Sequence, residues 1–138
     1  MPTRDKFHQL VRTSLETEGW TITHDPYHID LGLVDFYIDL GAELVLAAMK
    51  DREKIAVEIK TFLAPSTITD FHTALGQFIN YRIALEDNDP ERSLYLAIPT
   101  EIYQRFFQQS FIQKFIRKNE LYLLVYNTEK KENLQWIK

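Results

Sequence analysis

The spacing of apolar residues changes along the chain, and each change marks a boundary between predicted elements. Apolar side chains recur every three or four residues over residues 3–18, which predicts an opening helix with one buried face. Alternation with a period of two follows at residues 20–24 and 34–40 and predicts two strands. Asp25 and Pro26 interrupt this alternation, so a loop is predicted from there to about Gly32.

The middle of the chain predicts a hairpin followed by a long helix. Two strand-like segments, residues 44–50 and 54–62, flank a charged turn at residues 51–53. Ser66 is a suitable N-cap for a helix over residues 67–86. A helix that leads from a hairpin to a further strand predicts a mixed sheet.

The last third of the chain combines short apolar runs with one interrupted helix. The runs at residues 93–98 and 121–126 are nearly continuous, which is typical of strands that are buried on both faces. Between them a helix is predicted from residue 99 to residue 118, with a break near residues 108–110. Residues 134–137 predict a last short strand.

The order α-β-β-β-α-β-α-β predicts an α/β fold, in which a mixed β-sheet carries helices on its faces. A length of 138 residues with 45% hydrophobic and 26% charged residues predicts one globular domain over residues 1–138. The longest apolar run, residues 44–49, is too short to cross a bilayer, and the first residues lack the apolar segment of a signal peptide. We therefore expect a cytoplasmic protein that does not enter a membrane; a chain without cysteine agrees with this expectation.

The charge balance limits the ways in which the chain can bind nucleic acid. Twenty acidic residues face sixteen basic ones, for a net charge of −4. DNA affinity comes largely from the neutralisation of phosphates by basic side chains. Any DNA binding must therefore use a local basic patch, a bound cation or a partner protein.

The segment around Glu58 and Lys60 carries the clearest candidate chemistry. Residues two apart on a strand project to the same face, so an acid and a base meet within an otherwise apolar segment. Asp35, Asp39 and Glu43 lie upstream, and hairpin pairing can place one of them beside Glu58. Two carboxylates suit Mg²⁺ or Mn²⁺, and with a lysine they suit phosphodiester hydrolysis. The sequence leaves open which upstream acid is the first metal ligand.

A glutamate and a lysine at this spacing more often form a simple salt bridge, so the order of elements has to support the chemical interpretation. A helix, an acidic strand, a hairpin arm with Glu58 and Lys60, and a helix with Gln77 and Tyr81 resemble the core of PD-(D/E)XK nucleases. The resemblance implies a restriction-endonuclease-like αβββαβ core in which Gln77 and Tyr81 face the site. His8 stands where related nucleases often have a glutamate; it can bind a metal, relay a proton or simply be a half-buried helix residue.

A closer resemblance extends over nearly the whole chain. Several sequence blocks are similar to those of the XisH family, the controlling factors for excision of the fdxN element in cyanobacteria. The blocks are Phe7-His8, residues 19–26, residues 38–43, residues 55–60, residues 74–77 and residues 94–99. The resemblance implies an endonuclease-like fold, a role beside a site-specific recombinase and a partner of the XisI type. Met49 departs from the acidic residue expected at its position.

Three functions are compatible with these patterns. The first is a metal-dependent DNA endonuclease in which Asp39, Glu58, Lys60 and Gln77 converge. The second is a non-catalytic regulatory factor that keeps the nuclease fold as a scaffold. The third is a structural partner of another small protein, with an apolar patch on residues 103–115. A homodimer would match the two-fold symmetry of many recombination sites.

Overall fold

In the computed structural model, which describes residues 2–46, 51–129 and 134–138, one mixed sheet organises the fold. Its strands are β1 (Thr21–His24), β4 (Leu40–Leu46), β5 (Asp51–Ile59), β6 (Arg92–Pro99), β7 (Leu123–Tyr126) and β8 (Gln135–Ile137). They lie in the order β1-β4-β5-β6-β7-β8. The pairs β5–β6 and β6–β7 are parallel and the other three pairs are antiparallel. This arrangement confirms the predicted α/β class with a mixed sheet.

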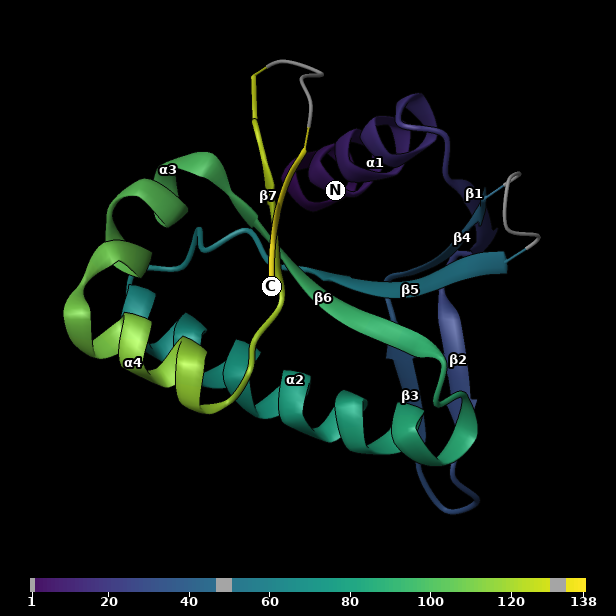
Figure 1. Cartoon of the computed structure of the whole chain (residues 1–138). Coiled ribbons are helices and arrows are strands. Elements are labelled where there is room, and N and C mark those ends of the chain that lie inside the picture. The colour runs from purple at the N-terminus through teal and green to yellow at the C-terminus, as the bar shows by residue number, and fades with distance from the viewer. Residues whose placement is uncertain (1, 47–50, 130–133) are drawn as a thin grey trace.

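Helices cover both faces of the sheet (Figure 1). Helix α1 (Pro2–Thr17) lies on one face, and α2 (Thr67–Asn88) lies on the other. On the α2 side the chain continues through α3 (Thr100–Gln104), a 3₁₀ turn and α4 (Ser110–Lys118). The predicted break near residues 108–110 is confirmed, because Gln109 is extended between the 3₁₀ turn and α4.

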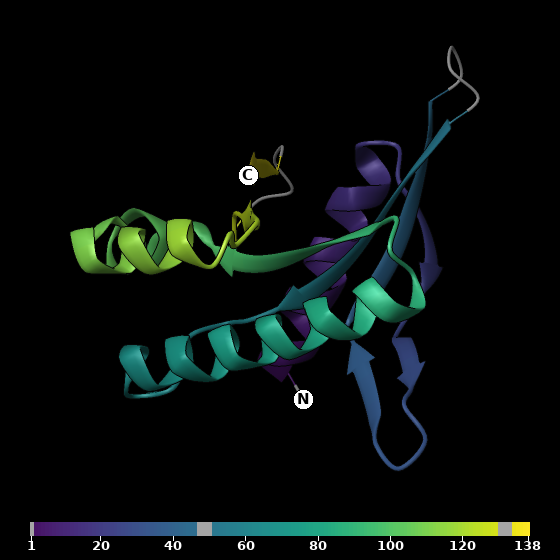
Figure 2. The same ribbon diagram turned by 60° about the horizontal axis from the view of Figure 1, so that its bottom comes forward.

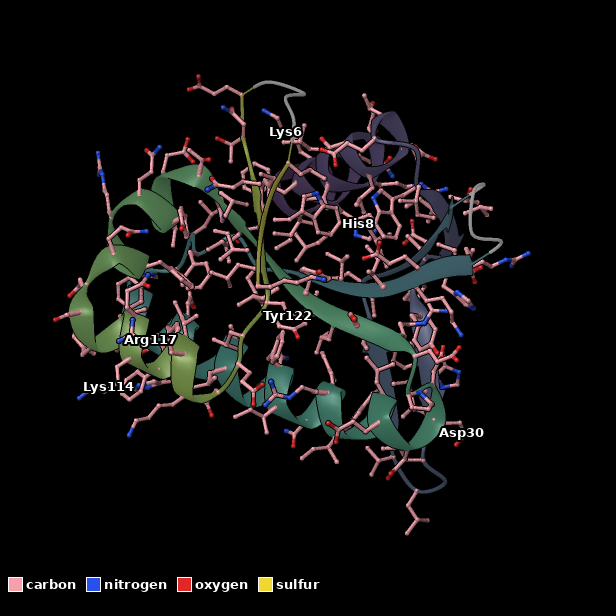
Figure 3. The ribbon with its side chains drawn as sticks, in the orientation of Figure 1. Lys6, His8, Asp30, Lys114, Arg117 and Tyr122 are labelled. Carbon is pink, nitrogen blue, oxygen red and sulfur yellow. The ribbon has the colours of Figure 1, made fainter. Side chains whose placement is uncertain are left out.

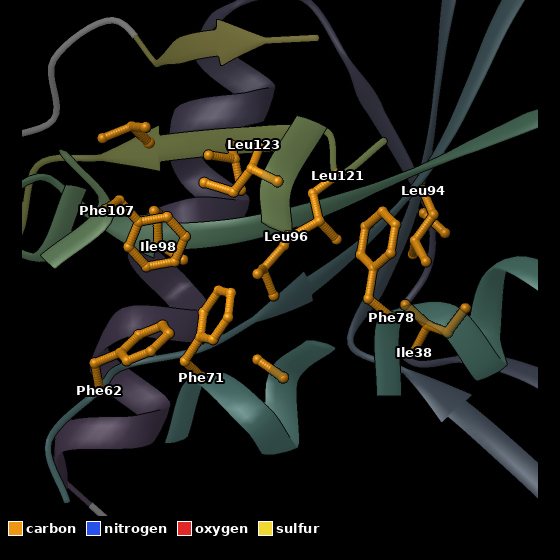
Figure 4. Close-up of a cluster of buried hydrophobic side chains, with 14 of the residues drawn as sticks. Ile38, Phe62, Phe71, Phe78, Leu94, Leu96, Ile98, Phe107, Leu121 and Leu123 are labelled. Atoms are coloured by element: carbon orange, nitrogen blue, oxygen red, sulfur yellow. The ribbon is translucent and has the colours of Figure 1, made fainter. Parts of the chain in front are cut away.

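The central strand β6 contributes to two separate apolar cores. Tyr95 and Ala97 pack in the core that includes the apolar stripe of α1. Leu94, Leu96 and Ile98 pack in the opposite core with α2, part of which is drawn in Figure 4. Burial on both faces explains why this strand is a continuous apolar run in the sequence.

The aromatic stretch at residues 103–115 is divided between the core and the surface. Phe107 is buried, and Tyr103 and Phe106 pack against the core formed with α2. Only Phe111 and Phe115 among its aromatic residues are exposed to a large extent. Most of this segment therefore stabilises the fold.

A second, two-stranded sheet projects from the main body (Figures 1 and 2). Its strands are β2 (Tyr27–Asp30) and β3 (Asp35–Ile38), which pair antiparallel. The prediction of a loop up to Gly32 was wrong for β2. This strand has only four residues, and its alternation of Tyr27 and Ile29 with polar residues is too short to distinguish it from a loop after Asp25 and Pro26.

Two predicted strand boundaries were also wrong. The segment at 34–40 is not one strand, because β3 ends at Ile38 and β4 begins at Leu40 in a different sheet. The predicted turn at 51–53 belongs to β5, where Arg52 and Glu53 pair with β4. Their charges are tolerated there because charged side chains can face solvent on one side of an antiparallel pair. Met49 lies outside the described residues.

Candidate functional site

The candidate site forms where the chain leaves the projecting hairpin and enters the main sheet. Leu40 of β4 pairs with Val57 of β5, so the residue before β4, Asp39, comes beside Glu58. The Asp39 backbone N–H donates to Oε1 of Glu58 at 3.2 Å, and Oδ2 of Asp39 accepts from the Ile59 N–H at 2.7 Å. Two carboxylates are thus held side by side by the backbone.

Lys60 follows β5 directly and adds the positive charge of the site. Its Nζ lies 3.4 Å from Oε2 of Glu58. Its backbone is fixed on both sides, because its N–H donates to the carbonyl of Ala97 at 2.9 Å and its own carbonyl accepts from the Tyr126 hydroxyl at 3.0 Å. These bonds extend the sheet past the end of β5 and keep the ammonium group beside the carboxylates.

These three residues line one cavity of about 580 Å³. Gln77 and Tyr81 from α2, His8 from α1 and Tyr37 from β3 line it as well. The structure therefore brings together six predicted site residues: His8, Asp39, Glu58, Lys60, Gln77 and Tyr81. Thr61 and Leu63 also line the cavity, and their sequence context contains no signal for this position.

The buried carboxyl of Glu58 has an unusual proton affinity. Glu58 as a whole is only 6% exposed to solvent. Burial, and then the charge of Asp39, raise the pKa of Glu58 to about 7, although Lys60 opposes this rise. Burial and the same two carboxylates raise the pKa of Tyr81 to about 12, so its hydroxyl keeps its proton at neutral pH. Strongly shifted pKa values in a cleft are typical of functional sites.

Gln77 contributes an acceptor that the protein leaves unpaired. Its amide oxygen Oε1 is buried and has no hydrogen-bond donor in the described part of the chain. Buried polar atoms in folded proteins are almost always paired, so an orphaned one needs an explanation. The side chain lines the cavity, so a rotation of its amide would turn this acceptor toward a bound group.

The donor set fits a hard divalent cation that keeps part of its hydration shell. Asp39 and Glu58 supply oxygen atoms, and Mg²⁺ is typically bound by one or two carboxylates with waters and substrate phosphates. Within the described residues, no group of three or more His, Asp or Glu side chains is placed to hold a metal ion. A closed structural site of the zinc type is therefore not formed by these residues.

Two predicted site residues, Glu43 and Asp35, do not line the cavity. Glu43 lies four residues from Asp39, about 13 Å along an extended chain, and its Oε1 accepts from Arg52 at 3.0 Å. Asp35 belongs to the hairpin, where it accepts from His28 at 2.9 Å. Of the three upstream acids, the pairing register thus brings only Asp39 to Glu58.

Sequence reasoning missed the polar contacts behind His8. Oδ1 of Asp25 lies 2.8 Å from Nε2 of His8, and Oδ2 of Asp25 accepts from Arg12. Seventeen residues separate His8 from Asp25. Only the packing of α1 against the end of β1 brings them together, so no local pattern could have revealed the contact.

Fold and site together define an α/β protein with a two-carboxylate, one-lysine cavity at the edge of a mixed sheet. The family described as "XisH protein" matches residues 1–134, and the chain belongs to this family. A comparison with the curated proteins gives no match. No helix in the described ranges is long and apolar enough to span a bilayer.

Two crystal structures are similar to the chain over almost its full length. An XisH family protein from Nostoc punctiforme PCC 73102 is 47% identical, with a TM-score of 0.87, over 96% of this chain and 99% of that one. An fdxN element excision controlling factor protein from Anabaena variabilis is 46% identical, with a TM-score of 0.87, over 97% of this chain and 99% of that one. The similarity to these family members therefore covers almost the whole fold of the chain.

Proposed function

We propose that the chain is a DNA-associated excision controlling factor that carries a metal-dependent endonuclease site of the PD-(D/E)XK type. The observation that carries the proposal is the convergence of Asp39, Glu58 and Lys60 with Gln77 in one cavity. The name of the Anabaena relative supplies the biological setting, which is excision of a DNA element. In that setting the site would cut or nick DNA in support of a site-specific recombinase.

The order of elements supports a restriction-endonuclease-like core. Helix α1, strands β1, β4 and β5, helix α2 and strand β6 follow one another as α-β-β-β-α-β. The hairpin β2–β3 is inserted between β1 and β4, and it delivers Asp39 to the sheet at its return. Acidic residues at the return of the insertion and at the end of β5 then meet on one edge of the core.

Each residue of the cavity has a role in this proposal. Asp39 and Glu58 would hold Mg²⁺ or Mn²⁺, which supplies positive charge to polarise the phosphodiester and lowers the pKa of water. Lys60 would offset the negative charge that develops on the phosphate oxygens. Gln77 would orient the bound groups through its side-chain amide, and Tyr81 would donate a hydrogen bond from its protonated hydroxyl.

A non-catalytic role of the same fold is the second candidate, and the charge of the chain favours it. A net charge of −4 gives little general attraction for DNA. In this version the chain binds a partner, such as an XisI-like protein, and contributes structure rather than hydrolysis. A basic partner protein would also solve the charge problem of the catalytic version, by adding basic surface beside the cavity.

Calorimetric titration with Mg²⁺ and Mn²⁺ tests the proposal. Wild type should bind either cation in the millimolar range or tighter, whereas Asp39→Asn and Glu58→Gln should not. Glu43→Gln is the matched control, because Glu43 is an acid on β4 that does not line the cavity. Absence of binding by the wild type, with and without duplex DNA, would overturn the catalytic proposal in favour of the scaffold. Loss of binding in Glu43→Gln would show that the cation does not bind in the cavity.

A further inference from the structure

A histidine at the rim of the cavity is held in one orientation by a charged pair. Nε2 of His8 lies 2.8 Å from Oδ1 of Asp25, while Oδ2 of the same carboxylate accepts from Arg12. Arg12 lies one helical turn after His8 on α1, so both reach the same acid. Asp25 thus ties the ring of His8 to the end of β1 and prevents free rotation.

This contact also determines which nitrogen of the ring is available. A carboxylate that is paired with an arginine can only accept, so Nε2 of His8 donates to Asp25. In the neutral ring Nδ1 then carries a lone pair, and no donor in the described residues uses it. The side chain is 24% exposed and lines the same cavity as Asp39 and Glu58.

The other polar groups that line the cavity either hold the cation in the proposed site or do not accept a proton at neutral pH. Asp39 and Glu58 are assigned to the cation, and Lys60 is an ammonium group paired with Glu58 at 3.4 Å. The pKa of Tyr81 is raised to about 12 by burial and by the two carboxylates, so this hydroxyl stays protonated. Gln77 does not titrate. Among the cavity residues that the structure describes, His8 alone offers an imidazole nitrogen.

We propose that His8 is the general base of the site and that Asp25 and Arg12 are its positioning residues. The inference rests on the proposed endonuclease function. In the step, the oxygen of a water molecule forms a bond to phosphorus and the bond from phosphorus to the leaving sugar oxygen breaks. The proton of the water moves to Nδ1 of His8, and the leaving oxygen takes a proton from solvent. The carboxylate of Asp25 stabilises the imidazolium that forms.

The chain contains a matched pair that serves as an internal control. On the hairpin, Nε2 of His28 lies 2.9 Å from Oδ1 of Asp35, which repeats the His8–Asp25 contact. His28 does not line the cavity, and Figure 3 places Asp30, at the end of β2, far from His8. Both histidines contact an acid, but only His8 lines the cavity and only its acid is also paired with an arginine.

Nicking of supercoiled plasmid under single-turnover conditions with Mn²⁺ tests the role of His8. General bases contribute on the order of 10²–10⁴-fold, so His8→Ala should slow nicking by that factor and added imidazole should restore part of the rate. Asp25→Asn should slow it by about 10–100-fold. The double variant should be no slower than His8→Ala alone, because the two residues act as a unit. His28→Ala should nick at the wild-type rate.

The outcomes separate this inference from the function on which it rests. Nicking by the wild type that persists in His8→Ala would overturn the role of His8 and leave the endonuclease proposal standing. A loss of nicking that imidazole does not restore, with Mn²⁺ binding retained, would reduce His8 to a structural residue. A wild type that binds Mn²⁺ and does not nick DNA would overturn both proposals.

Discussion

Two clusters of charged residues lie on one face of β5, and their environments differ. The first surrounds Lys54 and contains Glu43, Asp89 and Arg92; we call it the paired cluster. The second is the cavity around Glu58, about four residues or 13 Å farther along the strand. Both combine acids with a lysine, so composition alone does not distinguish them.

In the paired cluster both carboxylate oxygens of Asp89 accept hydrogen bonds. Asp89 accepts from Lys54 at 2.8 Å, from Arg92 at 2.9 Å and from the Tyr27 hydroxyl at 3.0 Å. Burial alone would raise the pKa of Asp89, but these hydrogen bonds outweigh burial and lower it. Arg92 also donates to the carbonyl of Ile55 at 2.8 Å, so it joins β5 to β6.

In the cavity, burial has a larger effect on the carboxyl pKa than the hydrogen bonds have. Burial and the charge of Asp39 raise the pKa of Glu58 to about 7, and the contacts with Lys60 and with the Asp39 N–H do not compensate. Gln77 adds an acceptor without a donor in the described residues. The paired cluster therefore stabilises the fold, whereas the cavity holds unsatisfied negative charge that a cation would neutralise. Four sets of substitutions test this difference.

Removal of Arg92 should cause the largest loss of stability. Its side chain is 3% exposed, and Arg92→Met would remove a charged partner of Asp89 and a donor to the carbonyl of Ile55. Breaking a buried ion pair in this way costs about 3–5 kcal/mol, which urea unfolding would measure. Arg52→Ala, at a side chain that is 66% exposed, is the control and should cost less than about 1 kcal/mol. Similar losses for the two variants would contradict a structural role of the paired cluster.

Substitutions of the two lysines on this face should affect different properties, cleavage for Lys60 and stability for Lys54. Lys60→Met should slow DNA cleavage by about 10²–10³-fold, because the charge that stabilises the phosphate oxygens is lost. Lys54→Met should leave the cleavage rate near that of the wild type but reduce the free energy of unfolding by about 1–3 kcal/mol, because Asp89 loses a donor. Rates from plasmid nicking and unfolding curves of both variants check this pair. A cleavage defect in Lys54→Met would show that the paired cluster also takes part in cleavage and would contradict this distinction.

Glu58→Gln should stabilise the fold at alkaline pH while it abolishes cation binding. The folded pKa of about 7 lies above the usual 4.5, so the native state binds more protons than the unfolded chain between these values. Stability from this group is therefore present below pH 4.5 and is lost as the pH rises through 7. At 1.36 kcal/mol per pKa unit, the variant should gain up to about 3 kcal/mol at pH 8. Urea unfolding at pH 5 and pH 8 measures the gain, and a variant less stable than wild type at pH 8 would contradict it.

The smallest effect is expected for a single hydroxyl of the paired cluster. Tyr27→Phe removes the bond to Asp89 and should cost about 1 kcal/mol. Tyr37→Phe is the matched control on the same hairpin, because Tyr37 is largely exposed and should change stability little. Equal effects in chemical denaturation would show that the hydroxyl of Tyr27 has no particular role.

Much of the fold could be predicted because burial leaves a periodic pattern in the sequence. Strand β6 and helix α2 are buried over long segments, and their patterns indicated them within a few residues. Strand β2 could not be found, because an alternation over only four residues next to Asp25 and Pro26 does not distinguish a strand from a loop. The turn was placed at residues 51–53 because charged residues are typical of turns, yet solvent-facing positions of β5 tolerate them equally well.

The site could be predicted only as far as local geometry reaches. The period of two places Glu58 and Lys60 on one face whatever the rest of the chain does. The choice among Asp35, Asp39 and Glu43 depends on the register of β4 against β5, which is set by the packing of the whole sheet. The contact of His8 with Asp25 depends on where α1 lies on that sheet, and no spacing in the sequence contains this information.

The central claim is that the cavity, and not the paired cluster, binds a divalent cation. A crystal soaked in Mn²⁺ tests this claim most directly, because anomalous scattering locates the ion without reference to activity. We expect an anomalous peak between the carboxylates of Asp39 and Glu58. A peak beside Glu43 and Asp89, or none at either cluster in a crystal soaked with duplex DNA as well, would contradict it.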